Sequence, residues 1–125
     1  MIKPRICHGV IRVNDDIYAM TGYSHYQLTP TNEVYNLTTD TWTQLPNLPG
    51  EGIMQATVAQ IKEHLFVAGQ DCANVYKFSL ENKEFETLKF TLSQPEENHK
   101  LFSWNDSLFI LEHETVWKLS EDGEI

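Results

Sequence analysis

The stretch DIYAMTGYSHYQLTPTNEVYNLTTDTWTQL, residues 16–45, decides the fold because its spacing recurs further along the chain. Four of its apolar positions are Tyr35, Leu37, Trp42 and Leu45. Residues of the same kind stand 43 positions later, at Phe78, Leu80, Phe85 and Leu88. Self-similarity at a period of this length is typical of repeated β-sheet units. The sequence therefore predicts a repeat architecture.

A predicted β-hairpin occurs three times along the chain. Its first copy has a strand over Cys7–Val13, polar turn residues at 14–16 and a second strand over Ile17–Met20. Asn and Asp favour such turns because they hydrogen-bond their own backbone. The pattern returns at an offset of 48, with turn residues 62–64, and after a further 43, with turn residues 105–107. Three copies of one hairpin are predicted.

Further strands are predicted after each hairpin, separated from it by a loop of variable length. Third strands are predicted at Val34–Leu37, Tyr76–Leu80 and Thr115–Leu119, with Tyr35, Phe78 and Trp117 in equivalent places. Fourth strands are predicted at Thr41–Leu45 and Glu84–Leu88 in the first two copies. No run shows a sustained helical period, so the predicted class is all-β.

Four short strands in repeats of about 40 to 50 residues are typical of propeller blades. The chain resembles the kelch repeat family, because Trp42 follows Tyr35 by seven positions, and Thr21-Gly22 and Gly69-Gln70 each keep half of a glycine pair. The third copy departs from the pattern, with Glu112-His113 in place of the glycines. The resemblance implies a kelch-type β-propeller segment of about three four-stranded antiparallel blades, with the last blade incomplete.

The repeats cover approximately residues 5–49, 53–92 and 96–125 of a single region spanning 1–125. Propellers use roughly 4 to 8 blades, so three blades do not close a ring by themselves. Three explanations stay open: a fragment of a longer propeller, a ring assembled from several copies as a homo-oligomer, or an open arc covered by a partner.

Seven aromatic side chains at the repeated positions are predicted to pack between blades. These are Tyr18, Phe66, Phe109, Tyr35, Phe78, Trp42 and Phe85.

The net charge of the chain limits the kinds of partner that it is expected to bind. There are 18 acidic and 9 basic residues, a formal net charge of −9, which argues against nucleic acid and anionic membranes. A basic protein or peptide fits better, although the acidity can also serve only to keep a loop-rich surface soluble. No apolar stretch approaches the roughly 20 residues of a membrane span and no signal sequence is evident near Met1, so a cytoplasmic location is expected.

Partner contacts are expected in loops. The kelch resemblance points to the loops between second and third strands and to the links between blades, here 23–33, 71–74, 50–53 and the region of Arg5. Tyrosine and histidine side chains combine hydrogen-bonding groups with a low entropy cost, although these rings can also fold back onto the blade. The expected partner-binding residues are Arg5, Tyr23, His25, Tyr26 and Gln27.

The expected function is a non-catalytic protein-interaction module or scaffold, with no cofactor and no metal. The alternative of another class is a structural element that completes a larger propeller or assembly. No Ser, His and Asp arrangement, phosphate-binding loop or metal-ligand spacing stands out in the sequence.

Two kinds of propeller enzyme remain as alternatives implied by the resemblance. A copper oxidase would use Tyr23, His25 and Tyr26 as metal ligands. A sugar-processing enzyme related to sialic acid epimerases would need carboxylates gathered with arginines at one mouth of the ring. The residues available for that are Arg5, Arg12, Glu51, Glu96 and Glu97.

Overall fold

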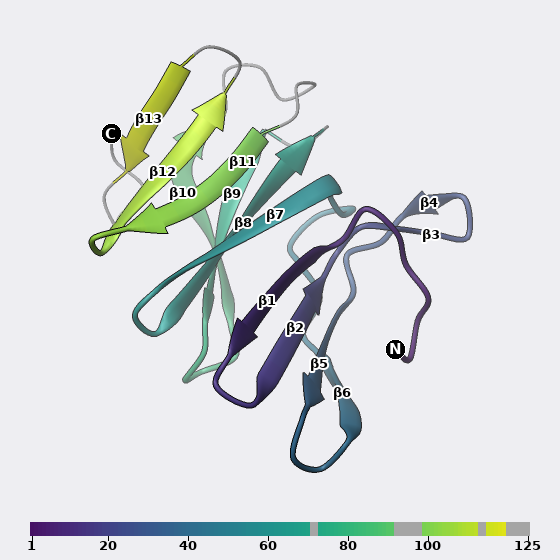
Figure 1. Ribbon diagram of the computed structural model, residues 1–125. Coiled ribbons are helices and arrows are strands. Elements are labelled where there is room, and N and C mark those ends of the chain that lie inside the picture. Colours follow the sequence, from purple (N-terminus) through teal and green to yellow (C-terminus); the bar gives the residue numbers. More distant parts are fainter. Residues whose placement is uncertain (71–72, 92–98, 113–114, 120–125) are drawn as a thin grey trace.

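The computed structural model describes residues 1–70, 73–91, 99–112 and 115–119 (Figure 1). Within these ranges the chain forms 13 strands and no helix, and therefore no helix that could cross a membrane. The strands form two four-stranded sheets, one three-stranded sheet and one small two-stranded sheet, all antiparallel. The all-β class predicted from the sequence is confirmed.

Each of the three larger sheets is built from consecutive parts of the chain. The first sheet contains, in spatial order, β1 (Gly9–Val13), β2 (Asp16–Met20), β5 (Asn32–Asn36) and β6 (Thr41–Leu45). The second contains β7 (Met54–Ile61), β8 (His64–Gln70), β9 (Asn74–Ser79) and β10 (Phe85–Thr91). The third contains β11 (His99–Trp104), β12 (Ser107–Glu112) and β13 (Thr115–Leu119). The small sheet pairs β3 (Tyr23–Ser24) with β4 (Gln27–Leu28).

The hairpin that opens each larger sheet has a two-residue turn that begins with left-handed backbone in all three copies. Asn14, Lys62 and Asn105 begin these turns with φ values of 55°, 51° and 53°. Each turn joins directly paired residues through two intervening positions, as between Val13 and Asp16. Two-residue hairpin turns use this left-handed backbone because its twist matches that of the strands. The predicted threefold repeat of one hairpin is confirmed.

The sheets are stacked face to face, with the second sheet between the first and the third (Figure 1). The opening strands lie next to one another, since β7 contacts both β1 and β11. The described residues form an arc of sheets consistent with part of a β-propeller, and they do not form a closed ring.

The second sheet buries both of its faces. Successive residues of a strand point to opposite faces. Leu65 and Val67 pack toward the first sheet, in a core with Tyr18 and Met20. Phe66 and its neighbours on the same face pack toward the third sheet, in a core with Leu101, Leu108 and Ile110. The hydrophobic core of the chain is thus two layers between three sheets.

We call the side that a sheet turns toward the next sheet in the chain its trailing face, and the opposite side its leading face. Tyr18, Phe66 and Phe109 are equivalent trailing-face residues in the three repeats. Tyr18 and Phe66 are 2% and 0% exposed, whereas Phe109 is only half-buried. The difference arises because Phe109 has no further sheet beside it among the described residues.

The prediction that seven aromatic side chains pack between blades is correct for four of them, including the half-buried Phe85, which packs against the core between the first two sheets. Tyr18, Phe66 and Phe78 are buried, as predicted. The remaining three are also half-buried: Phe109, Tyr35 and Trp42. Tyr35 and Trp42 pack on each other with ring centroids 5.1 Å apart. They lie on the leading face of the first sheet, which no described sheet covers.

The predicted alignment of the third copy was wrong by two residues. Tyr35 pairs with Ile17 and Phe78 with Leu65, and the corresponding partner of Leu108 is Leu119. Leu119 rather than Trp117 therefore stands where Tyr35 and Phe78 stand. Residues two apart share a face, so the apolar pattern permits either register and the pairing of the strands decides between them.

The equivalent positions Phe66 and Phe109 give a matched test of this packing. We expect Phe66→Ala to lower the free energy of unfolding by about 3 to 5 kcal/mol, because it empties a closed core. Phe109→Ala should cost only about 1 kcal/mol, because its ring is already half in water. Urea denaturation at low chain concentration measures both, and equal losses would contradict the stacked arrangement.

Candidate interaction site

The loop predicted over residues 23–33 contains the β3–β4 hairpin, which the sequence did not predict. Tyr23 pairs with Leu28 and Ser24 with Gln27. Ile6 joins this hairpin, because Ile6 and Tyr23 exchange two backbone hydrogen bonds of 2.9 Å. The chain segment before β1 thus forms one side of the same small sheet.

Gly22 allows this segment to approach. Its φ is 107°, a conformation that residues with a side chain rarely adopt. A Cβ atom on Gly22 would lie 2.6 Å from the carbonyl oxygen of Ile6 and 3.0 Å from the Cα atom of His8. The glycine therefore permits the crossing of the N-terminal segment over the end of β2.

The turn of the β3–β4 hairpin has an unfavourable sequence for its backbone. His25 and Tyr26 both have positive φ, at 51° and 66°. Turns with two such residues favour Asn-Gly or similar pairs. Left-handed backbone costs roughly 1 to 2 kcal/mol per residue with an ordinary side chain. The turn is therefore a local strain, of the kind that occurs at functional sites.

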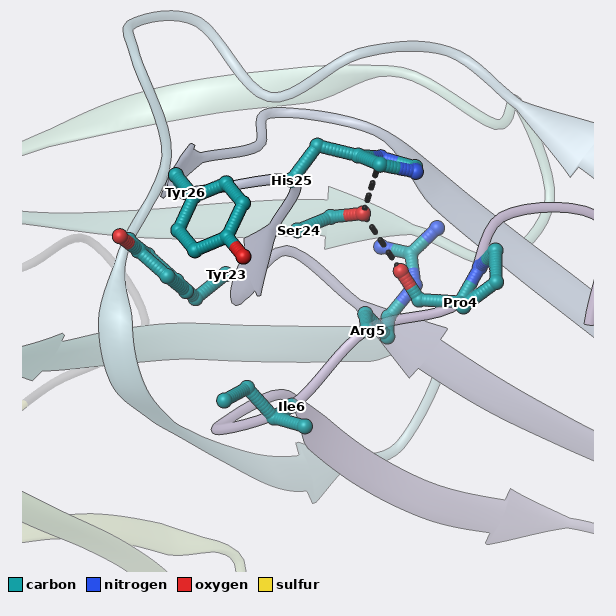
Figure 2. A pocket seen from close by; sticks show the side chains of 7 residues that line it. All are labelled: Pro4, Arg5, Ile6, Tyr23, Ser24, His25 and Tyr26. Atoms are coloured by element: carbon teal, nitrogen blue, oxygen red, sulfur yellow. Dashed lines mark hydrogen bonds between the residues drawn. The ribbon is translucent and has the colours of Figure 1, made fainter.

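This hairpin and the N-terminal segment enclose an open groove of about 410 Å³, which we call the hairpin groove. It is lined by residues 4–6 and 23–26. Figure 2 shows the rings of Tyr23 and Tyr26 on one side of the view, Pro4 and Arg5 on the other, and Ser24 between them. Tyr26 is 95% exposed and Ile6 is 62% exposed. The groove therefore presents apolar and aromatic surface to solvent.

Hydrogen bonds at the groove fix the tautomer of His25. The Ser24 hydroxyl donates to the carbonyl oxygen of Pro4 at 2.6 Å, and its oxygen lies 3.0 Å from Nδ1 of His25 (Figure 2). Because the single hydroxyl proton is given to Pro4, Nδ1 of His25 must be the donor in the second bond. In the neutral ring, this leaves Nε2 of His25 as an acceptor. It also means that His25 is not placed to take a proton from Ser24.

Arg5, one of the expected partner contacts, lines the groove from a buried position. Its guanidinium pairs with the Glu33 carboxylate at 2.5 Å. It also donates to the carbonyl oxygens of Thr21 and Thr31. Burial fits this role, because a buried guanidinium needs a partner for its charge and its donors. Arg5 thus holds the N-terminal segment in place, with its charge paired to Glu33.

Glu33 is the acceptor that completes this arrangement. Its carboxylate receives hydrogen bonds from the backbone N–H groups of Ile2 and Lys3, in addition to Arg5. Burial alone would raise the pKa of Glu33, but the bonds from Ile2, Arg5 and Lys3 outweigh it and hold the pKa below its ordinary value. The carboxylate therefore stays charged and fixes residues 2–5.

The second repeat fills the same place without charges. By repeat offset and strand pairing, Ile53 corresponds to Arg5 and Tyr76 to Glu33. Ile53 is 0% and Tyr76 is 4% exposed, and both belong to the core between the first two sheets. Equivalent positions are thus occupied by an ion pair in the first repeat and by two core side chains in the second.

The structure separates the remaining predicted contact regions. Gln27 is exposed on β4, next to the hairpin groove but outside its lining. In the link 50–53, Ile53 is buried and its N–H donates to the Thr21 hydroxyl at 2.7 Å, so this end of the link belongs to the core. Residues 71–72 lie outside the described ranges. Ser24 lies in the predicted loop 23–33. Pro4 and Ile6 were missed, and the only signal for them was the predicted link around Arg5.

The two enzymatic alternatives would each require a particular set of side chains. There, no group of three His, Cys, Asp or Glu side chains could hold a metal ion. Tyr23, His25 and Tyr26 do come together, but all three belong to one hairpin. Of the arginines, Arg5 is paired with Glu33, and Arg12 donates to the carbonyl oxygen of Asn14. Glu96 and Glu97 lie outside the described ranges.

Comparison with known families identifies one part of the chain. Residues 4–49 match the Kelch motif. This range contains Arg5, the first sheet and the β3–β4 hairpin. No curated protein matches the chain. The resemblance predicted from the sequence is thereby confirmed.

The ion pair can be tested against the solution used by the second repeat. We expect Arg5→Ile alone to cost about 3 kcal/mol of unfolding free energy, because it leaves the Glu33 carboxylate buried without its cation. Adding Glu33→Tyr should recover part of that loss. Urea denaturation of both single variants and the double variant measures the coupling. Strictly additive losses would show that the two side chains do not interact.

The lowered pKa of Glu33 also predicts a pH dependence. Its stabilising effect should be complete above the ordinary pKa of 4.5 and be lost as the pH falls through the lower pKa of the folded state. The stability difference between wild type and Glu33→Gln should therefore shrink on acidification. Urea titrations of both proteins from neutral pH downward measure this, and a constant difference would contradict the assignment.

Proposed function

We propose that this chain, whose residues 4–49 match the Kelch motif, is a kelch-repeat protein that acts as a protein-interaction module through the hairpin groove. The observation that carries the proposal is Tyr26, which is 95% exposed at the tip of a turn with an unfavourable backbone for its residues. Kelch repeats are generally interaction domains, which supports the same assignment.

The turn sequence supports a role in binding rather than in stability. An Asn-Gly pair would suit the left-handed positions at 25 and 26 better than His-Tyr. Tyr26 has almost no protein contact that would compensate the strain, since nearly all of its surface is in water. Tyrosine is among the residue types that dominate binding energy when a partner buries them.

The lining of the groove indicates the chemistry of the partner. The exposed Ile6 and Tyr26 and the half-buried Tyr23 offer apolar and aromatic surface, and Nε2 of the neutral His25 ring offers a hydrogen-bond acceptor. The chain carries a net charge of −9, which attracts cationic partners over a distance. A basic side chain could lie over an exposed tyrosine ring in a cation–π contact. The proposed partner is a peptide segment that contains lysine or arginine.

Both sides of the groove are fixed before any partner binds. The Arg5–Glu33 pair holds the N-terminal segment, and the two backbone bonds between Ile6 and Tyr23 tie that segment to the hairpin. A preorganised site loses little conformational entropy on binding. The proposed action is therefore presentation of a rigid surface, without a chemical step.

A turn exchange tests the proposal, with peptides selected from a random library on the wild-type chain as the probe. The variant His25→Asn/Tyr26→Gly should have a free energy of unfolding that is about 1 to 2 kcal/mol higher, because the new residues suit the left-handed backbone of the turn. It should also bind the selected peptides at least about tenfold more weakly, because it lacks the exposed ring. Urea denaturation and fluorescence anisotropy measure the two effects.

Asp106→Gly is the matched control. Asp106 also has a positive φ, of 59°, in the β11–β12 turn, and the variant creates an Asn-Gly pair there. It should gain stability without any change in peptide affinity. Selected peptides that bind the turn exchange as tightly as wild type would contradict the proposed site.

A further inference from the structure

The trailing face of the third sheet is an exposed apolar surface. Phe102, Trp104, Leu111 and Val116 on this face are 43%, 69%, 43% and 54% exposed. Phe109 lies among them and stacks on Phe102, with ring centroids 5.2 Å apart. An apolar patch of this kind usually marks a surface that a partner covers.

The equivalent positions in the second sheet are buried by the next sheet. Ala59, Phe66 and Ala68 correspond to Phe102, Phe109 and Leu111, and they are 4%, 0% and 0% exposed. All three belong to the core between the second and third sheets. The trailing face of the third sheet is therefore a surface of a type that this chain covers with the leading face of another sheet.

A leading face of the required type is itself uncovered, at the other end of the chain. Val10 on the leading face of the first sheet is 54% exposed, and Ile17, Tyr35 and Trp42 beside it are half-buried. The equivalent residues of the second sheet pack against the first sheet, in the order Val58, Leu65, Phe78 and Phe85. The first sheet thus carries the residue types that cover a trailing face elsewhere in the chain.

The two uncovered faces do not meet within one chain, because the second sheet stands between them (Figure 1). We propose that the trailing face of the third sheet binds the leading face of the first sheet of a second copy. Two copies related by a twofold axis cover both kinds of face at once and close the assembly.

Charges at the two faces complement each other in this arrangement. Within the chain, Nζ of Lys83 lies 3.0 Å from the hydroxyl of Tyr18, across the contact between the first two sheets. Asp40 occupies the place of Lys83 in the first repeat, since both have φ near 55° to 58° and donate their N–H to the residue four positions earlier. Asp40 of one copy would therefore approach Phe109 of the other.

Lys118 provides the matching charge. It pairs directly with Phe109 on the neighbouring strand, so it stands beside the place that Asp40 would reach. Both Asp40 and Lys118 are exposed in the single chain. At the contact within the chain, Val34 stands in the place of Lys118 and Lys83 in the place of Asp40. An uncharged residue faces a lysine there, whereas the contact between two copies would bring a lysine and an aspartate together.

Light scattering and sedimentation of the purified chain test the proposal. We expect a species of twice the chain mass of 14.5 kDa that does not grow further as the concentration rises. Leu111→Glu and Val10→Glu, one on each face, should give monomers by light scattering. Both variants should remain folded by circular dichroism, because the two side chains are already largely exposed in the single chain.

A charge exchange gives the sharper test. Asp40→Lys and Lys118→Asp should each weaken the dimer about fivefold, and the double exchange should restore it. Glu63→Lys, at an exposed turn outside both faces, is the control and should leave the dimer constant unchanged.

Several outcomes would overturn the proposal. These are a folded wild-type chain that stays monomeric at every concentration, and open oligomers that grow with concentration. A dimer insensitive to Leu111→Glu and Val10→Glu, or a double charge exchange no better than the single changes, would do the same. The turn exchange at His25 and Tyr26 lies outside both faces and should leave the mass unchanged, so failure of the peptide site and failure of the dimer are distinguishable.

Discussion

Burial of both faces of the second sheet is the constraint on which the rest of this structure depends. β8 supplies the residues for it in alternation, with Leu65 and Val67 toward the first sheet and Phe66 and Ala68 toward the third. A sheet with two apolar faces needs a neighbour on each side, because exposed apolar surface is unfavourable in water. The two outer sheets follow the same pattern, so each retains one face that no other described sheet covers.

The Arg5–Glu33 pair shows how the same architecture is adapted at its end. Between the first two sheets, Ile53 and Tyr76 fill the corresponding place as core residues. In the first repeat an ion pair fills it, with further hydrogen bonds to Ile2 and Lys3. A buried ion pair contributes little net stability but fixes geometry, because its hydrogen bonds require a defined arrangement. That arrangement positions Pro4 and Ile6 at the hairpin groove.

The hairpin groove combines a rigid support with a strained tip. Ile6, Gly22 and Tyr23 bring the N-terminal segment and the hairpin together through backbone bonds and close approach. At the tip, His25 and Tyr26 adopt left-handed backbone that costs stability. Strain of this kind persists where the surrounding structure imposes it, and it is concentrated at sites of function. Tyr26 is exposed at this tip.

The sequence by itself determined the strands and the repeat. The spacing from Tyr35 to Trp42, repeated from Phe78 to Phe85, and the polar turns at Asn14, Lys62 and Asn105 are local patterns. They predict sheets because side-chain alternation and turn preference act within a few residues. The contact residues Tyr23, His25 and Tyr26 could be proposed for the same reason, since they occupy the variable loop of the first repeat.

Only the tertiary structure decided what those residues contact. The pairing of Leu108 with Leu119 corrected the third repeat by two positions, which preserve the face and therefore the apolar pattern. The burial of Arg5 depends on Glu33, 28 positions away, and no local pattern reveals such a partner. Equivalent residues such as Phe66 and Phe109 differ in exposure for the same physical reason: burial depends on which sheet lies opposite, and that is fixed only when distant parts of the chain pack together.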